Sequence, residues 1–148
     1  MTTVGVFAAV FDAEGRVLCV RHAYGSQEWG MPGGRMEAGE EPISAVKREV
    51  AEEAGVRAEI TEFVGVYAAP YRDDLVLVFK GQVQEQLEWS PTEEISECGF
   101  FSLTDLPKPM AANPQSRFSD LIAAQRGVFR TFTAPGVRSP ELSLTILS

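Results

Sequence analysis

The chain is a succession of short apolar segments, interrupted by one longer segment in which apolar and polar residues alternate with a helical period. The short segments are rich in Val, Phe and other residues that favour extended structure. They predict strands at residues 4–11, 16–21, 56–67, 75–83, 98–103 and 128–133. Residues 12–15 end in glycine and predict the turn that joins the first two strands.

The longer periodic segment predicts a helix over Pro42–Ala54. Proline suits a first helical turn, the acidic Glu40 and Glu41 complement the helix dipole, and Gly55 ends the pattern. Apolar residues at spacings of three and four predict the face that packs on a core: Ile43, Val46, Val50 and Ala54.

Weaker patterns complete the outline. Residues 116–125 predict a second helix, whereas residues 25–34 and 85–97 have the composition of loops. Strands on both sides of the central helix predict an α/β domain with a mixed sheet. We expect one domain over residues 1–135 and a loosely held tail over residues 136–148.

Three glutamates share one patch of the predicted helix. Glu49, Glu52 and Glu53 are three and four residues apart, so their side chains converge. The like-charge pair Glu49–Glu53 costs an isolated helix about 0.2–0.5 kcal/mol. The nearby cations, Lys47 and Arg48, lie upstream, whereas solvated acidic helices normally interleave both signs. A solvated face is one interpretation; the other is a set of oxygen ligands for Mg²⁺.

A glycine pair, Gly33-Gly34, precedes this helix. Glycines let the backbone approach a ligand closely, and a carbonyl there is a further metal ligand. An ordinary glycine-rich turn is the alternative, and the metal interpretation depends on the glycines and glutamates occurring together.

Composition and charge narrow the function. The 148 residues carry a net charge of −8, which disfavours binding to extended nucleic acid, because phosphate contacts supply most of that affinity. No apolar run approaches the roughly 20 residues that span a bilayer. Cys19 and Cys98 lack metal-type spacing and predict free thiols. We expect a cytoplasmic protein that binds a small ligand and no membrane, and a homodimer is compatible with the sequence.

The residues around the glutamates resemble the signature of the Nudix hydrolase family. That signature is Gly, five residues, Glu, seven residues, Arg-Glu, an aliphatic residue, any residue, Glu-Glu, any residue, Gly and an aliphatic residue. The chain matches it without departure at Gly34, Glu40, Arg48, Glu49, Val50, Glu52, Glu53, Gly55 and Val56.

The resemblance implies an α/β/α sandwich with a mixed sheet, and hydrolysis of a nucleoside diphosphate linked to another moiety with Mg²⁺ or Mn²⁺. It implies that Glu49 and Glu53 are the main metal ligands. Glu52 is implied as a further ligand or a catalytic base, and the Gly33 carbonyl as an additional ligand.

The resemblance also assigns the residues that support the metal ligands and the candidates for the catalytic base. The resemblance implies that Arg48 orients the carboxylates and that Glu40 braces Arg48, with Gly34 giving the loop its close approach. Family members differ in whether the base lies in the signature helix or in a later loop. The loop candidates here are Glu93, Glu94 and Glu97, and we favour Glu97 because it directly precedes a predicted strand.

Other polar and aromatic residues have two interpretations. Arg21 and Arg35 are candidate phosphate clamps, because arginine binds phosphate through paired hydrogen bonds, although both also fit a plain surface. The sole histidine, His22, has no evident nucleophile to partner and is interpreted as structural or peripheral. Four aromatic residues could stack on a base but are more typical of a core: Trp29, Tyr67, Tyr71 and Phe79.

The signature does not select the substrate. Pro70 lies 15 residues after Gly55, which resembles ADP-ribose hydrolases, and the adjacent Tyr71 resembles dinucleoside polyphosphate hydrolases. We favour a nucleoside diphosphate sugar such as ADP-ribose, with a nucleoside triphosphate as the alternative. A domain that senses a nucleotide without hydrolysing it is the hypothesis from another functional class, and cleavage of RNA 5′ ends is disfavoured by the acidity.

Overall fold

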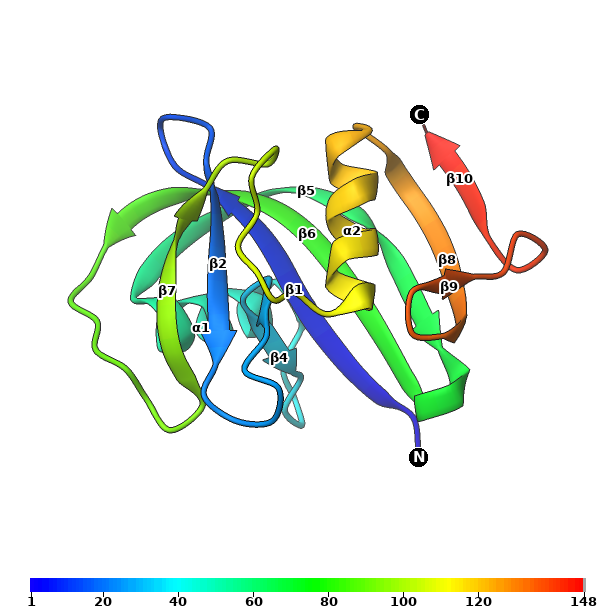
Figure 1. Cartoon of the computed structure of the whole chain (residues 1–148), viewed down its shortest axis with the longest axis horizontal. Helices are drawn as coiled ribbons and strands as arrows, with labels where there is room; N and C mark the ends of the chain where they lie inside the picture. Colours follow the sequence, from blue (N-terminus) through cyan, green and yellow to red (C-terminus); the bar gives the residue numbers. More distant parts are fainter. Residues whose placement is uncertain (148) are drawn as a thin grey trace.

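The computed structural model describes residues 1–147 and arranges them around one large curled sheet (Figure 1). Three helical segments accompany the sheet: α1 (Pro42–Ala54), a short 3₁₀ turn η1 (Pro70–Arg72) and α2 (Ala112–Ile122). The strands are β1 (Thr3–Phe11), β2 (Val17–His22), β3 (Trp29–Gly30), β4 (Gly33–Arg35), β5 (Val56–Ala69), β6 (Asp74–Gln86), β7 (Ile95–Phe101), β8 (Arg126–Ala134), β9 (Val137–Arg138) and β10 (Leu144–Leu147). Within these residues, no helix combines the length and apolar character required to cross a membrane.

The sheet is mixed, as predicted. Its main path runs β10-β8-β5-β6-β1-β2-β3, with β4 paired to β1 and β7 paired to β2. The β1–β6 and β5–β8 pairs are parallel, whereas β5–β6 and β2–β7 are antiparallel. The two long helices lie on opposite faces of this sheet, so the predicted α/β sandwich is confirmed (Figure 1).

The core has two halves, one under each helix. Along β1, Val6, Ala8 and Val10 belong to the α1 half, whereas Ala9 belongs to the α2 half. Successive strand residues point to opposite faces, so a strand with apolar residues at every position is buried on both sides. This burial explains why β1 is an apolar run without the alternation typical of a surface strand.

Helix α1 has the predicted bounds for local reasons. Glu41 caps its start by accepting the backbone N–H groups of Ile43 and Ser44. Gly55 ends it in the left-handed conformation, with φ 62°, which glycine adopts without steric cost. The predicted apolar stripe is buried except for Ile43, which is 43% exposed because it lies in the first turn, outside the packed face.

Several predicted boundaries were wrong. The segment 25–34 was predicted as loop, yet it contributes β3 and the start of β4 through pairing with β2 and β1. Strand β7 begins within the predicted loop 85–97, and α2 begins four residues before the predicted 116. Strands β4 and β7 pair with β1 and β2, which are far away in the sequence, so local composition carries no signal for these two strands.

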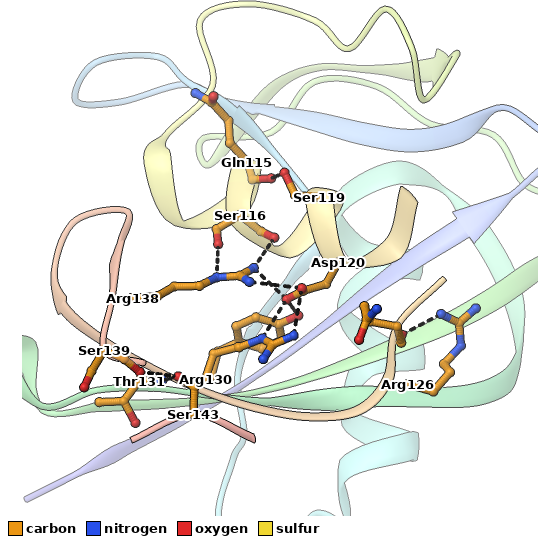
Figure 2. Close-up of polar contacts among 12 residues, drawn as sticks. Gln115, Ser116, Ser119, Asp120, Arg126, Arg130, Thr131, Arg138, Ser139 and Ser143 are labelled. Carbon is orange, nitrogen blue, oxygen red and sulfur yellow. Dashed lines mark hydrogen bonds and ion pairs between the residues drawn. The ribbon is translucent and has the colours of Figure 1, made fainter. Parts of the chain in front are cut away.

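The tail, which the sequence predicts to be loosely held, contributes two short strands within its described residues. Strands β9 and β10 both pair with β8. Arg138 donates to Asp120 at 2.7 Å and to the Ser116 hydroxyl at 2.7 Å, which ties the tail to α2 (Figure 2). Asp120 is buried and also pairs with Arg130 at 3.3 Å. A buried carboxylate with two guanidinium partners fixes this segment firmly.

Candidate active site

Glu53 is the most deeply buried of the signature glutamates. Its side chain is 7% exposed, and its Oε1 accepts the backbone N–H of Gly33 at 2.8 Å. Burial raises the pKa of this carboxyl to about 8, and the hydrogen bond from Gly33 offsets part of that effect. No arginine or lysine of the described residues forms an ion pair with it. The Glu53 carboxylate therefore has no cationic partner among the described residues, and a divalent cation would fill that role.

Glu49 lies against the second glycine of the pair. A side chain on Gly34 would place its Cβ 2.7 Å from the Glu49 carboxyl carbon, closer than real Cβ atoms come. Strand β4 is held there because Val6 and Phe7 of β1 pair with Gly34 and Gly33. Burial raises the pKa of Glu49, while Arg48 opposes that shift. The glycine pair thus forms a cradle for two carboxylates.

Arg48 contacts Glu40 and two of the signature glutamates. Its Nε and Nη2 donate to the two oxygens of Glu40 at 2.8 and 2.9 Å. Its Nη1 donates to Glu49 at 3.0 Å and to Glu52 at 3.2 Å. The hydrogen bonds from Arg48 lower the pKa of Glu40 to about 2. The guanidinium is therefore anchored on one side and holds two signature carboxylates on the other.

A cavity of about 710 Å³ opens over these residues. Gly33, Gly34, Arg35, Glu49 and Glu53 line it, whereas Glu52 lies outside its lining and its side chain is 60% exposed. Loop and strand residues complete the wall: Thr3, Gly5, Phe7, His22, Tyr24, Met36, Glu37, Arg72, Asp74 and Glu94. A second cavity of about 640 Å³, between the 103–110 loop and α2, carries none of the signature carboxylates.

Of the predicted site residues outside the cavity lining, Arg21 and Glu97 also make no contact with the signature glutamates in any hydrogen bond or ion pair of the described residues. Glu97 and Arg21 face each other across the β2–β7 pair and form an ion pair of 3.4 Å. Arg21 also donates to the carbonyl of Gln27 at 2.9 Å. Because β7 starts at residue 95, Glu97 lies inside a strand and not in the loop that reaches the cavity. The loop residue that does reach it is Glu94.

Sequence reasoning missed or undervalued four residues of the wall. Glu94 was the less favoured loop acid, and His22, interpreted as structural or peripheral, lines the cavity with a pKa lowered by burial. Arg72 and Asp74 reach it because β6 pairs with β1. The only sequence signal for the last two was the adjacent Pro70-Tyr71 cue. By contrast, three of the four candidate stacking aromatics are core residues, as expected: Trp29, Tyr67 and Phe79.

The oxygen ligands at Glu49, Glu53 and Gly33 fit a hard divalent cation that also binds the substrate. Over residues 1–147 no three Asp, Glu, His or Cys side chains converge closely enough to hold a metal by themselves. Two carboxylates, those of Glu49 and Glu53, line the cavity together with Gly33, whose backbone N–H donates to Glu53. Mg²⁺ characteristically takes one or two carboxylates and completes its octahedron with water and substrate phosphate. The cradle suits that mode of binding.

Comparisons with known proteins agree with this geometry. Residues 1–122 match the family described as NUDIX domain. A MutT-like protein from Streptomyces ambofaciens is 36% identical over 105 residues, covering 64% of this chain and 68% of that protein. A relative from Bacillus subtilis, provisionally named an 8-oxo-dGTP diphosphatase, is 29% identical and covers 81% of this chain and 80% of that protein.

A solved structure shows the same arrangement. An ADP-ribose pyrophosphatase from Streptococcus suis superposes with a TM-score of 0.68 at 25% identity, covering 88% of this chain and 98% of that one. The Bacillus subtilis relative is named a diphosphatase and the Streptococcus suis structure a pyrophosphatase, and the family match spans both long helices and the carboxylate cradle. This chain therefore belongs to the Nudix hydrolase family.

Proposed function

We propose that this chain hydrolyses the diphosphate bond of a small nucleotide in which a nucleoside diphosphate is linked to another moiety, with Mg²⁺ or Mn²⁺ held by Glu49, Glu53 and the Gly33 carbonyl. The observation that carries the proposal is the buried Glu53 carboxylate, which faces Glu49 in an open cavity without a positive partner among residues 1–147. Nudix hydrolases generally use divalent metal ions and act on small nucleotides.

The reaction requires a water to attack one phosphorus while the bond to the bridging oxygen breaks and a phosphate group departs. A divalent cation at the cradle would neutralise the diphosphate charge and orient the attacking water. Arg48 keeps Glu49 and Glu52 in position through its anchor on Glu40. Arg35, on the cavity wall, is the phosphate clamp that the geometry supports.

We assign the catalytic base to Glu94 in preference to Glu97. A base must reach the water proton within hydrogen-bond distance or through one further water. Glu94 lines the cavity with Glu49 and Glu53, whereas Glu97 is paired with Arg21 on a neighbouring strand. Glu52, near the cradle but outside the cavity lining, remains the assisting carboxylate in this assignment.

The moiety beyond the diphosphate is proposed from the relatives and from η1. The Streptococcus suis structure and a Methanocaldococcus jannaschii relative, 37% identical over 82 residues, are both named ADP-ribose pyrophosphatases, which supports a nucleoside diphosphate sugar. The Bacillus subtilis name supports a nucleoside triphosphate as the second candidate. Pro70 and Tyr71 lie in η1, next to the Arg72 of the cavity wall, so the residues that suggested a substrate class are close to the site.

A substrate panel tests the proposal. Purified protein is incubated with Mg²⁺ and ADP-ribose, other nucleoside diphosphate sugars, nucleoside triphosphates and dinucleoside polyphosphates, and released phosphate is measured after coupling to a phosphatase. The E53Q variant serves as the matched inactive control. Turnover of at least one compound, lost in E53Q, is the expected result. If the protein binds nucleotides but hydrolyses no compound of the panel, the hydrolase proposal is refuted and a nucleotide-sensing function takes its place.

A further inference from the structure

Tyr24 is an aromatic residue of the cavity wall that the proposed reaction does not use. It lies in the 23–28 loop between β2 and β3, and it lines the catalytic cavity together with the glycines and carboxylates of the cradle (Figure 1). The residue is nevertheless 61% exposed. Single exposed apolar residues are common on protein surfaces and need no explanation. Tyr24 differs from them because its ring faces a cavity of ligand size.

Hydrogen bonds hold the loop that carries Tyr24 in place. The Ala23 N–H donates to the Glu94 carbonyl at 2.8 Å, and the Gln27 N–H donates to the Tyr24 carbonyl at 3.1 Å, which closes a tight turn. Arg21, which the sequence suggested as a phosphate clamp, instead donates from its Nε to the Gln27 carbonyl at 2.9 Å. Tyr24 is therefore already positioned at the cavity, so a ligand that contacts it need not first order the loop.

A second ring supports the tyrosine. The ring centres of His22 and Tyr24 are 5.3 Å apart, and the two planes are inclined at 33°. This spacing lies within the range in which aromatic pairs attract each other. His22 lines the same cavity and is half-buried. Two packed rings therefore form one part of the cavity wall, and the exposure of Tyr24 leaves ring surface uncovered there.

The third aromatic residue of the described cavity wall, Phe7, is already covered. The guanidinium carbon of Arg117 lies 5.3 Å from the centre of its ring, over one face. The edge of the ring also packs against the glycine pair, since a Cβ on Gly33 would lie 2.5 Å from the Phe7 Cδ1. Among the described residues that line the cavity, ring surface is thus available to a ligand at Tyr24 and His22.

Acidic residues beside the two rings select the part of a nucleotide that fits them. Glu94 lines the cavity and is bonded through its backbone to Ala23, and the His22 N–H donates to the Glu28 carbonyl at 3.0 Å. A phosphate bound at the rings would meet these carboxylates and be repelled. A flat, uncharged group meets no such penalty and gains apolar contact with the rings. In a nucleotide, the flat and uncharged group is the base.

We propose that Tyr24 is a specificity-determining residue on which the base of the substrate stacks, with His22 supporting its ring, while the diphosphate lies at the cradle. The inference rests on the proposed function in so far as the cavity is the substrate site. Stacking is tolerant of sequence, because every base has a π face. The two rings therefore favour nucleotides over sugar phosphates, whether the substrate is a nucleoside diphosphate sugar or a triphosphate.

The test is equilibrium binding of compounds without a diphosphate bond, so that it does not depend on hydrolysis. AMP, GMP and ribose 5-phosphate are titrated by calorimetry into the whole chain, once with Mg²⁺ and once with EDTA. We expect the wild type to bind the better of AMP and GMP roughly 5- to 150-fold more tightly than ribose 5-phosphate, the order by which one aromatic ring favours a stacked base. Y24A should lose most of this preference through weaker nucleotide binding, whereas Y24F keeps the ring and should retain it. F129A, at an exposed phenylalanine of β8 that lines neither cavity, is the matched control and should behave as the wild type.

The remaining outcomes all count against the role of Tyr24. Wild-type protein that binds ribose 5-phosphate as tightly as the nucleotides, or binds no nucleotide with or without Mg²⁺, overturns the inference. A preference that survives in Y24A, or is lost equally in Y24F, also overturns it, because the ring would then not be the cause. A loss in Y24A that affects ribose 5-phosphate as much as the nucleotides would show that Tyr24 only shapes the cavity.

The proposed function fails separately from this inference. A base preference that depends on Tyr24, without turnover of any compound in the substrate panel, would refute only the hydrolytic proposal. Turnover without such a preference would refute only the stacking role.

Discussion

Replacing Glu53 by glutamine should stabilise the metal-free protein while abolishing its metal response. The buried carboxyl has a pKa of about 8 in the fold, against 4.5 for the unperturbed group, because burial disfavours its charged form. Glutamine has nearly the same shape, cannot ionise, and still offers an oxygen to the Gly33 N–H. E53Q therefore removes the ionisation and keeps the hydrogen bond.

The size and sign of the effect follow from linkage. Because folding raises the pKa of Glu53, this group takes no stability from the folded wild type below pH 4.5. The folded wild type then loses stability steadily as the pH rises from 4.5 to about 8. Each pH unit in that window costs about 1.4 kcal/mol, so at pH 7 the metal-free wild type is destabilised by about 3 kcal/mol relative to E53Q. Below pH 4.5 the carboxyl is protonated in both folded and unfolded chains, and the difference should vanish.

The measurement is urea unfolding in EDTA at pH 4.5, 5.5, 6.5 and 7.5 for the wild type, E53Q and the control E59Q on exposed Glu59 of β5. The free-energy difference between wild type and E53Q should grow with pH, whereas E59Q should track the wild type. Millimolar Mg²⁺ should raise the melting temperature of the wild type and not that of E53Q, whose kcat should fall by orders of magnitude. A difference independent of pH, or an equal response to Mg²⁺, would refute the assignment of Glu53 as a buried ligand.

Three further predictions concern the base, the cradle and the tail. Glu94→Gln should lower kcat by roughly 10²–10⁴-fold with little change in KM, and Glu97→Gln should leave turnover close to wild type; steady-state kinetics with the best panel substrate distinguishes them. Gly34→Ala should weaken Mg²⁺ binding by roughly 10–100-fold, measured by calorimetry, because the new methyl group collides with a carboxylate of the cradle. Asp120→Ala should cost about 3 kcal/mol in urea unfolding, since it leaves a partly buried Arg138 unpaired; an unchanged midpoint would mean that the tail contributes no stability.

The features that sequence predicted well are those decided within a few residues. The bounds of α1 depend on Glu41, Pro42 and Gly55, all adjacent to the helix they start or end. Helical spacing alone predicts that Glu49 and Glu53 lie on one face of α1, and both line the cavity, whereas Glu52 lies outside it. The mixed α/β class follows from strand-like segments on both sides of that helix, and the family match agrees with it.

The features that sequence predicted poorly depend on strand register. Whether Glu94 or Glu97 reaches the cavity is set by where β7 joins β2, and a shift of one residue would turn every side chain of β7 to the other face. Arg138 of the tail finds Asp120 on α2 only because β9 folds back on β8. These contacts join segments that are far apart in the sequence. The local composition of either segment is the same whether or not the contact forms, so it does not predict the contact.

The electrostatic repulsion among the glutamates of α1 does not fall equally on Glu49, Glu52 and Glu53, as helical spacing alone would suggest. No cation lies one turn downstream, but the upstream Arg48 turns its guanidinium onto Glu49 and Glu52 and is itself anchored by Glu40. Those carboxylates are thus partly neutralised, whereas Glu53 has only the Gly33 N–H and remains desolvated. The electrostatic penalty of the signature is concentrated on one residue, the one deepest in the cavity. A divalent cation that binds there removes the largest single penalty, so metal binding and the stability of the fold should rise together.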